Sequence, residues 1–457
     1  MPSLNIAKLR LRDYRCFDAI DVEFHEQLTV LVASNGVGKT SILDAIAVAF
    51  GPYIGAFDEA TGKHFEPSDI RLVRVRETAS NEMEYAAKGV RLEATGFIPG
   101  SMFDELGEDA PTVWKRALSG PTKAKTTMKD AKELGDYGKR QQDAVRTPGA
   151  DPTLPLLAYY GTGRLWQQKK LMEGKLPRTS RTIGYADCLD PASSYKSFVA
   201  WFRYWSTNAF KGQLDASKAG LAYEATEFDH YIESVSGAVN TCLAAAKWKN
   251  IAYSLSREEL VAHHDQYGEL PVELLSDGIR NMIGMVADIA FRATKLNPQF
   301  GSDAAKKTPG IVLIDEVDMH LHPQWQQVVL QSLTAAFPML QFIVTTHSPQ
   351  VLSTVRRECI RVIRKTEEGY EAQMPSMSPL AREAGDALAY VMDTHAQPQM
   401  PLLEEVRQYE QLVRAGQEET DVARLVRQRL DVAGYEIPES SLVTWRFLAS
   451  RNMRSGV

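Results

Sequence analysis

The segment that most constrains this chain is residues 33–40, which read ASNGVGKT and lie between two apolar runs. Residues 28–32 (LTVLV) are apolar and β-branched, as a buried strand is, and residues 41–50 (SILDAIAVAF) have apolar positions at helical spacing. Between a strand and a helix, glycines let backbone N–H groups wrap a phosphate, a lysine adds positive charge, and a threonine hydroxyl can hold Mg²⁺. The sequence therefore predicts a nucleotide-phosphate loop.

This loop supplies the first candidate site residues. Ala33 stands where the usual GxxxxGK[ST] pattern has its first glycine. Because alanine disfavours positive φ, we expect the chain to enter the loop in a milder conformation. We expect Thr40 to bind Mg²⁺ as well, and ATP to be bound by Asn35, Gly36, Val37, Gly38, Lys39, Thr40 and Ser41.

Two later strands end in side chains suited to phosphate chemistry. Residues 311–316 (IVLIDE) form an apolar strand that delivers Asp315 and Glu316 to the carboxyl edge of a sheet, where α/β folds bind ligands. We expect Asp315 to hold Mg²⁺ through its water shell and Glu316 to polarise the attacking water. His347, thirty-two residues after Asp315 in TTHSP, can hydrogen-bond a γ-phosphate and orient that water.

A fourth element precedes these strands, since residues 275–278 read LSDG before a run with apolar positions at helical spacing. Ser276 or Asp277 can cap that helix and present its N-terminus to an anion. The order of phosphate loop, LSDG, strand-DE and strand-TTH resembles the ATP-binding-cassette ATPases. That resemblance implies a head-to-tail dimer or higher oligomer that closes on ATP, with Ser276, Asp277 and Gly278 acting in trans and Asp318 at the interface.

The N-terminal residues favour one branch of these ATPases. Alternation of apolar and polar positions predicts antiparallel strands near residues 9–24, and the opening KLRLRDYRCFDAIDVEF resembles RecF, SMC and OLD-type ATPases. This resemblance implies that Arg15 reaches nucleotide phosphates; an exposed strand-end arginine is the alternative. The expected fold class is α/β, an ABC-type (SMC/RecF-like) P-loop ATPase head with antiparallel N-terminal strands, a helical insertion lobe and a C-terminal helical region.

The spacing of the motifs suggests the domain organisation. Lys39 and Ser276 are 237 residues apart, so we expect an ATPase domain over residues 1–365 with an insertion and helical lobe near 100–265. Residues 366–457 are expected to form a C-terminal helical region and a possible partner dock.

Two stretches inside the expected lobe have a distinctive composition. Residues 100–151 have few large apolar side chains, and we interpret them as a solvated excursion, with lysine contacts to a phosphate backbone as the alternative. Trp201, Tyr204 and Trp205 recur at helical spacing. We expect them in the core, and the alternative is a base-stacking platform.

Several longer segments together resemble one family, the PtuA ATPases of Septu anti-phage systems and their relatives. These segments are YYGTGRLW, Arg181 with GYADCLDP, SSYKSFVAWF, LLSDGIRNM, LIDEVDMHLHPQWQ and FIVTTHSPQVL. The resemblance implies an HNH nuclease, PtuB, as the partner. The helices near residues 402–430 are either its dock or packed on their own ATPase core.

The chain lacks the marks of a nuclease. Only 110 residues follow His347 and none contains the DxD of a Toprim domain, and no HNH-like ligand run appears. The leading hypothesis is therefore a Mg²⁺-dependent ATPase that regulates or scaffolds an HNH nuclease in anti-phage defence. The alternatives are a RecF/SMC-like repair ATPase that binds DNA across its dimer, and a scaffold that hardly turns ATP over.

Composition limits the location and the partners. No run approaches the roughly 18 apolar residues of a membrane span, and the N-terminus lacks a signal-peptide core, so we expect a cytoplasmic protein without a membrane partner. The 52 basic and 58 acidic residues give a net charge of −6. Any DNA contact is therefore expected in a local groove rather than over a basic surface.

Overall fold

The chain forms two compact units, Met1–Asp393 and Thr394–Val457. The computed structural model describes residues 3–74, 82–100, 111–122, 124–163, 180–191, 196–392 and 402–455. The boundary expected at residue 365 falls inside a strand of the first unit, Ile360–Thr366. We describe each unit separately.

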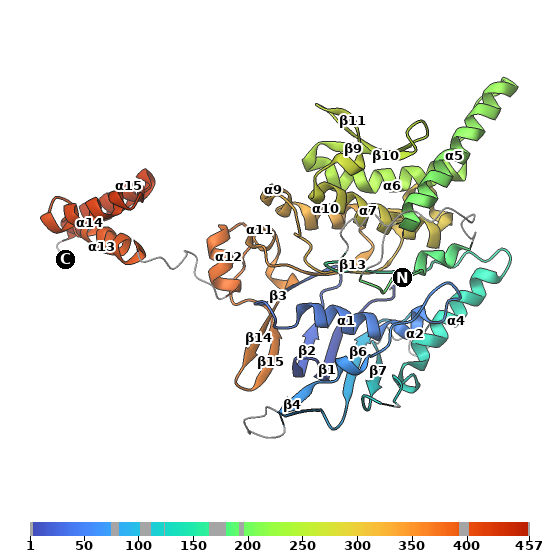
Figure 1. Cartoon of the computed structure of the whole chain (residues 1–457), viewed down its shortest axis with the longest axis horizontal. Coiled ribbons are helices and arrows are strands. Elements are labelled where there is room, and N and C mark those ends of the chain that lie inside the picture. The colour runs from blue at the N-terminus through green and yellow to red at the C-terminus, as the bar shows by residue number, and fades with distance from the viewer. Residues whose placement is uncertain are drawn as a thin grey trace. The chain divides into compact units, whose positions relative to one another are not determined.

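A six-stranded sheet forms the centre of the first unit (Figure 1). Its order is β15-β14-β3-β13-β12-β8, with every neighbouring pair parallel except β14 and β15. Every residue of β12 and β13 is buried, as expected for parallel strands covered on both faces. The strands span Leu28–Val32 (β3), Leu156–Tyr160 (β8), Gly310–Ile314 (β12), Leu340–Thr345 (β13), Ile360–Thr366 (β14) and Gly369–Gln373 (β15).

A second, antiparallel sheet has the order β2-β1-β6-β7, which confirms the antiparallel N-terminal strands. Leu9, Leu11, Ile20 and Val22 are buried on one of its faces. Helix α1 (Lys39–Ala49) contacts both β13 and this sheet and so lies between the two sheets (Figure 1). The strands span Lys8–Tyr14 (β1), Phe17–Glu23 (β2), Val90–Gly96 (β6) and Thr112–Leu118 (β7).

The interpretation of residues 100–151 as a solvated excursion is wrong for the parts that the structure describes. Strand β7 pairs with β6 along its whole length, and its Trp114 and Arg116 donate hydrogen bonds to the last carbonyls of α1, at 3.0 and 2.7 Å. Helix α4 (Lys132–Arg146) stacks Tyr137 on Tyr53 of α2 (Gly51–Ile54). A few large apolar residues at the right spacing suffice for burial, although the stretch as a whole is polar. Residues 101–110 lie outside the described residues.

A helical lobe follows, with helices α5 (Lys196–Ala219), α6 (Glu227–Leu243) and α7 (Asp277–Leu296). Trp201 and Trp205 of α5 are 5% and 1% exposed and pack on Phe291 of α7, and Tyr204 is partly buried against the same core, which confirms the core interpretation. The lobe also carries a sheet of order β11-β10-β9, with strands at Trp248–Ser254 (β9), Glu259–His264 (β10) and Gly268–Pro271 (β11).

The remaining elements of the first unit are short. Two small strands, β4 (Leu72–Arg74) and β5 (Met83–Tyr85), pair with each other. The other helices span Ala304–Lys307 (α8), Pro323–Gln326 (α9), Val329–Ala336 (α10), Pro349–Leu352 (α11) and Ala384–Val391 (α12). Turns of 3₁₀-helix lie at Pro67–Asp69, Lys129–Ala131, Arg181–Tyr185, Ala244–Ala246, Val272–Leu274, Pro298–Asp303 and Arg357–Cys359. Within the described ranges, no helix has the length and apolarity needed to cross a bilayer.

The second unit consists of helices α13 (Leu402–Arg414), α14 (Asp421–Val432) and α15 (Glu439–Ser455). These helices bury their apolar faces against one another in a core of their own, made of Val406, Tyr409, Val413, Ala423, Val426, Leu430 and Ile437.

Candidate functional site

The phosphate loop connects β3 to α1 and depends on two glycines with positive φ. Gly36 has φ 79° and Gly38 has φ 106°. A Cβ atom at Gly38 would also overlap the ring of Phe17 and the sulfur of Cys16, so this position excludes side chains on two grounds. Ala33 does not have a positive φ, as expected from the sequence.

Lys39 and Thr40 form the first turn of α1. No side chain caps this helix at Gly38, so the N–H groups of its first turn face the loop. Lys39 is only 7% exposed, and its ammonium donates a 3.1 Å hydrogen bond to the carbonyl of Ala33. Burial lowers the pKa of Lys39, and the carboxylates of Asp315 and Glu316 oppose that shift. The loop therefore holds a positive charge that faces two carboxylates.

The end of β12 meets the phosphate loop directly. The Thr40 hydroxyl donates a 2.8 Å hydrogen bond to Oδ2 of Asp315. A hydroxyl and a carboxylate are the oxygen donors that Mg²⁺ prefers beside phosphate groups, so Thr40 and Asp315 are suited to hold this ion. Glu316, the next residue, has φ 48°, a left-handed conformation that is uncommon outside glycine.

The turn after β13 brings a histidine to the same place. Burial and the charge of Lys39 lower the pKa of His347, while Glu316, Asp318 and Asp315 act in the opposite direction. The lowered pKa favours a neutral imidazole, which has one donor and one acceptor nitrogen for a phosphate and a water. Four expected residues from three separate stretches of chain, Lys39, Asp315, Glu316 and His347, thus act on one another electrostatically.

Two threonines that the sequence interpretation did not single out hold these carboxylates. The Thr345 hydroxyl donates to Oδ1 of Asp315 at 2.6 Å and accepts the N–H of Glu316 at 2.7 Å. The Thr346 hydroxyl donates to Oδ1 of Asp318 at 2.5 Å. Both threonines belong to the TTHSP motif. The sequence signal that could have identified them is a pair of adjacent hydroxyls at the end of one strand, where the neighbouring strand ends in carboxylates.

The start of α7 carries the three residues of the expected signature. Ser276 and Asp277 are exposed, and Ser276 is the N-cap residue but makes no side-chain capping bond. Among the described residues, no hydrogen bond or ion pair connects Ser276, Asp277 or Gly278 to the phosphate loop; Asp277 instead pairs with Arg280. A Cβ atom at Gly278 would overlap the carbonyl oxygen of His320, two residues after Asp318. The helix start therefore lies against the turn that carries the expected interface aspartate.

Arg15 holds two carboxylates in this structure. Its guanidinium contacts Asp69 at 2.8 Å and Asp44 of α1 at 2.5 Å. Asp44 also accepts a 3.0 Å hydrogen bond from the hydroxyl of Tyr159 in β8. Arg15 thus ties the β1–β2 turn to α1, and its expected contact with nucleotide phosphates stays a prediction.

The segments YYGTGRLW and GYADCLDP position α7. Tyr160 of β8 and Arg292 of α7 both donate 2.7 Å hydrogen bonds to the buried carboxylate of Asp288. Arg181 donates to the last carbonyl of α7, that of Leu296, at 2.9 Å. Residues 164–179, which include the end of the first segment, lie outside the described residues. The described parts therefore anchor the helix whose start carries Ser276.

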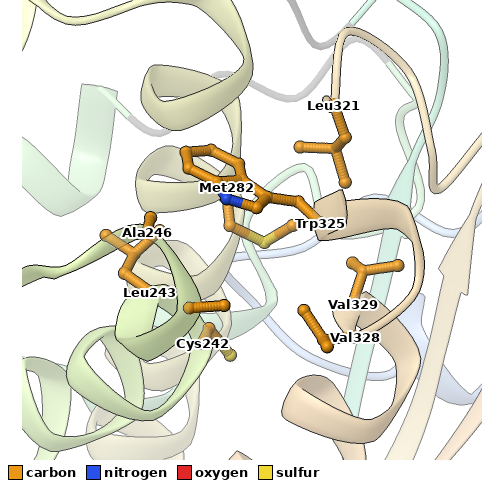
Figure 2. Close-up of a pocket in the computed structure, with 9 residues that line it drawn as sticks. Cys242, Leu243, Ala246, Met282, Leu321, Trp325, Val328 and Val329 are labelled. Atoms are coloured by element: carbon orange, nitrogen blue, oxygen red, sulfur yellow. The ribbon is translucent and has the colours of Figure 1, made fainter. Parts of the chain in front are cut away.

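A small apolar pocket lies between the end of α6 and the segment that follows the Asp318 turn. Figure 2 shows the indole of Trp325 extending across Met282 toward Ala246. The cavity is about 10 Å³, which is at most the room of one water molecule. We therefore assign the pocket to packing between α6, α7 and α9 rather than to a ligand.

Comparison with family models covers both halves of the site. Residues 8–222 match a model described as an AAA domain. Residues 252–353 match a model described as an AAA domain, putative AbiEii toxin, Type IV TA system. The first match contains the phosphate loop, and the second contains the LSDG, DE and TTH segments.

Known proteins similar to the chain include two retron proteins and a Septu protein. The retron Vc95 probable ATPase of Vibrio cholerae serotype O1 biovar El Tor is 26% identical over 91% of this chain and 86% of its own length. The retron Ec83 probable ATPase of Escherichia coli is 26% identical over 80% and 72%. Septu protein PtuA of Bacillus mycoides is 35% identical, over 26% of this chain and 18% of its own length. The expected resemblance to PtuA is thus confirmed.

Among solved structures, an SMC head bound to the C-winged helix domain of ScpA aligns over 81% of this chain and 98% of that chain, with a TM-score of 0.46 and 14% identity. The SMC head domain from Thermotoga maritima has a TM-score of 0.41. The strand order and loop geometry described above, together with the two family models, identify the chain as an ATPase of the AAA type, related to proteins of retron and Septu systems.

Proposed function

We propose that the chain binds Mg²⁺-ATP at the phosphate loop and hydrolyses it with Glu316 as the residue that polarises water. The observation that carries the proposal is the 2.8 Å hydrogen bond between Thr40 and Asp315, because it joins the phosphate loop to the acidic strand end. Bound Mg²⁺ would offset phosphate charge between these two side chains. The backbone N–H groups of residues 35–41 and the Lys39 ammonium would bind the phosphates.

Glu316 and His347 have complementary tasks in this proposal. A carboxylate beside the acidic strand end can accept a hydrogen bond from the attacking water and align it with the γ-phosphate. His347 favours the neutral form, so its imidazole can donate to a phosphate oxygen without competing with Lys39 for the role of fixed positive charge. In this proposal Lys39 supplies the fixed positive charge, and His347 orients the phosphate and the attacking water.

The site would be completed by a second copy of the chain. Ser276 and Asp277 are exposed at the start of a 20-residue helix, where the helix dipole and free N–H groups favour an anion. In a head-to-tail dimer, Ser276, Asp277 and Gly278 of one copy would cover the γ-phosphate held by the other, and Asp318 would lie at the interface. Higher oligomers would be built from such dimers.

The ATPase cycle would govern an effector nuclease in anti-phage defence. This part of the proposal rests on relatives named as retron ATPases and a Septu protein, and an HNH nuclease of the PtuB kind is the partner that the resemblance implies. The second unit is the proposed dock. It has its own core, and Val422 and Leu425 on the outer face of α14 are 53% and 51% exposed.

A DNA-binding ATPase of the RecF/SMC kind has less support. The outer face of the antiparallel sheet has a hollow of about 530 Å³ lined by Arg10, Arg12 and Lys115, among other residues. Each of these three pairs with a carboxylate of Asp21 or Glu93, at 2.6 to 3.1 Å. Arg91, Arg116 and Asp130 also line the hollow, so five basic side chains face three acidic ones, and the net positive charge offered to a phosphate backbone is small.

Steady-state ATP hydrolysis by purified Glu316→Gln tests the catalytic assignment. We expect the variant to bind ATP with nearly wild-type affinity and to hydrolyse it at least about a hundredfold more slowly, because the amide cannot accept a proton from water. Glu368→Gln, an exposed glutamate on the β14–β15 turn, is the matched control. Hydrolysis by Glu316→Gln at the wild-type rate would refute the assignment.

A further inference from the structure

The end of β13 is bonded through its side chains to the turn that follows β12. Thr345 and Thr346 are both fully buried, and each donates its hydroxyl hydrogen to a different carboxylate of that turn. Ser348 continues the series, since its hydroxyl donates to Gln326 at 2.7 Å, and Gln326 donates to the carbonyl of Leu321 at 3.0 Å. The hydroxyls of the TTHSP segment therefore hold the turn directly at its two aspartates and, through Gln326, at the carbonyl of Leu321.

Thr345 is bonded to the two residues proposed for Mg²⁺ binding and water activation. Its hydroxyl donates to Asp315 and accepts the N–H of Glu316, while its carbonyl accepts the N–H of Val317 at 3.0 Å. Glu316 is left-handed, a conformation that persists in a non-glycine residue only when the surroundings hold it. Thr345 therefore determines both the orientation of the Asp315 carboxylate and the direction in which Glu316 leaves the strand.

Thr346 is bonded to a different carboxylate. It donates to Asp318 at 2.5 Å and accepts the N–H of Ser348 at 2.9 Å. Asp318 is only partly buried, unlike Asp315, which is 3% exposed. The bond from Thr346 therefore orients a carboxylate that a second copy could reach, whereas the bond from Thr345 orients one inside the nucleotide site.

We propose that Thr345 and Thr346 are positioning residues with separate tasks: Thr345 aligns Asp315 and Glu316 for hydrolysis, and Thr346 aligns Asp318 for contact with a second copy. The proposal rests on the proposed function, because it assigns its effects to hydrolysis and to ATP-dependent association.

Valine substitutions test each hydroxyl, because valine keeps the shape of threonine and removes the donor. In Thr345→Val we expect kcat to fall about tenfold to a hundredfold, as lost hydrogen bonds to charged groups imply, with ATP affinity changed less than about threefold. Thr345→Ser keeps the hydroxyl and should restore kcat to within about threefold of wild type. A Thr345→Val chain with wild-type kcat, or a serine variant as slow as the valine variant, would overturn the role of Thr345.

A different readout tests Thr346. In the Glu316→Gln background, which should accumulate the ATP-bound state, we expect Thr346→Val to weaken ATP-dependent self-association about tenfold by sedimentation velocity, while ATP affinity at low protein concentration stays unchanged. Thr346→Ser should associate like its parent. Unchanged self-association of the valine variant would overturn this half of the proposal.

Two further measurements separate folding and the proposed function from this inference. Thermal unfolding reports whether the variants fold. If Thr345→Val does not fold, the ratio of kcat in Thr345→Ser to kcat in Thr345→Ala measures the contribution of the hydroxyl. A ratio near one would overturn the proposal. A wild-type chain without ATPase activity would overturn the proposed function itself. Wild-type activity combined with an unimpaired Thr345→Val chain would overturn this inference alone.

Discussion

The starts of helices α1 and α7 are alike in polarity and different in surroundings. The start of α1 is connected to the rest of its site, since Lys39 is buried and Thr40 is bonded to Asp315 of another strand. The start of α7 presents Ser276 and Asp277 to solvent, and within the described residues no hydrogen bond or ion pair connects them to that site. One chain thus carries one helix start that is bonded into its site and one that is exposed, which is the arrangement that the proposed shared site requires.

The largest effect is expected from removing the positive charge at the start of α1. Lys39→Ala removes the buried positive charge that faces the phosphates, and we expect ATP affinity to fall at least about a hundredfold in isothermal titration calorimetry. Lys306→Ala, at an exposed lysine, is the control for loss of a charge alone. Tight ATP binding by Lys39→Ala would show that the start of α1 is not the phosphate site.

The two glycines of the loop should differ in their tolerance of a side chain. Gly38→Ala would overlap Phe17 and Cys16 at a φ of 106°, so we expect about 2–4 kcal/mol of destabilisation. Gly36→Ala meets no atom within 4 Å, which leaves only the cost of positive φ, about 1–2 kcal/mol. Thermal unfolding of both variants, each with and without ATP, measures the difference. Equal losses would mean that the contact with Phe17 and Cys16 does not constrain the loop.

The far end of α7 should affect stability without affecting nucleotide binding. Arg181→Ala leaves the Leu296 carbonyl without its side-chain donor, and we expect about 1–2 kcal/mol of destabilisation in thermal unfolding. ATP affinity should match wild type, because Arg181 holds the C-terminal end of the helix and Ser276 lies at the other end. A large loss of ATP affinity with unchanged stability would contradict this division of the helix.

The smallest expected effect is a shift in pH dependence. Burial and Lys39 lower the pKa of His347 in the free chain, so the acid limb of kcat/KM that depends on this residue should lie below pH 6.5, the ordinary histidine value. The folded-state pKa is lower than the unfolded one, so the unfolded chain binds more protons and stability falls as pH drops through this region. His347→Asn should remove that limb from the kcat/KM profile. A limb above pH 6.5 that disappears in His347→Asn would contradict the assignment.

The parts of the molecule that could be predicted from sequence are those that adjacent residues determine. Strand β3, the loop and α1 follow one another in the chain, and β12, β13 and α7 each have a clear apolar pattern. Burial of Trp201 and Trp205 was also predictable, because helical spacing places them on one face.

The parts that could not be predicted depend on partners far apart in sequence. Residues 100–151 as a whole have few large apolar side chains, which predicts a solvated stretch, whereas Trp114 and Arg116 of strand β7 donate hydrogen bonds to the last carbonyls of α1. The tasks of Thr345 and Thr346 depend on the parallel pairing of β12 with β13, which no local pattern reports. Likewise Arg15 finds Asp44 and Asp69 only once β1 and α1 have packed.

The claim that two copies share each site is tested most directly by mixing two inactive variants. Lys39→Ala keeps an intact Ser276, and Ser276→Arg keeps an intact phosphate loop, so each alone should lack ATPase activity. In a one-to-one mixture about half of the dimers are mixed and each holds one complete site, so we expect about a quarter of the wild-type rate. An inactive mixture of folded variants, or wild-type activity of Ser276→Arg alone, would contradict a site completed in trans.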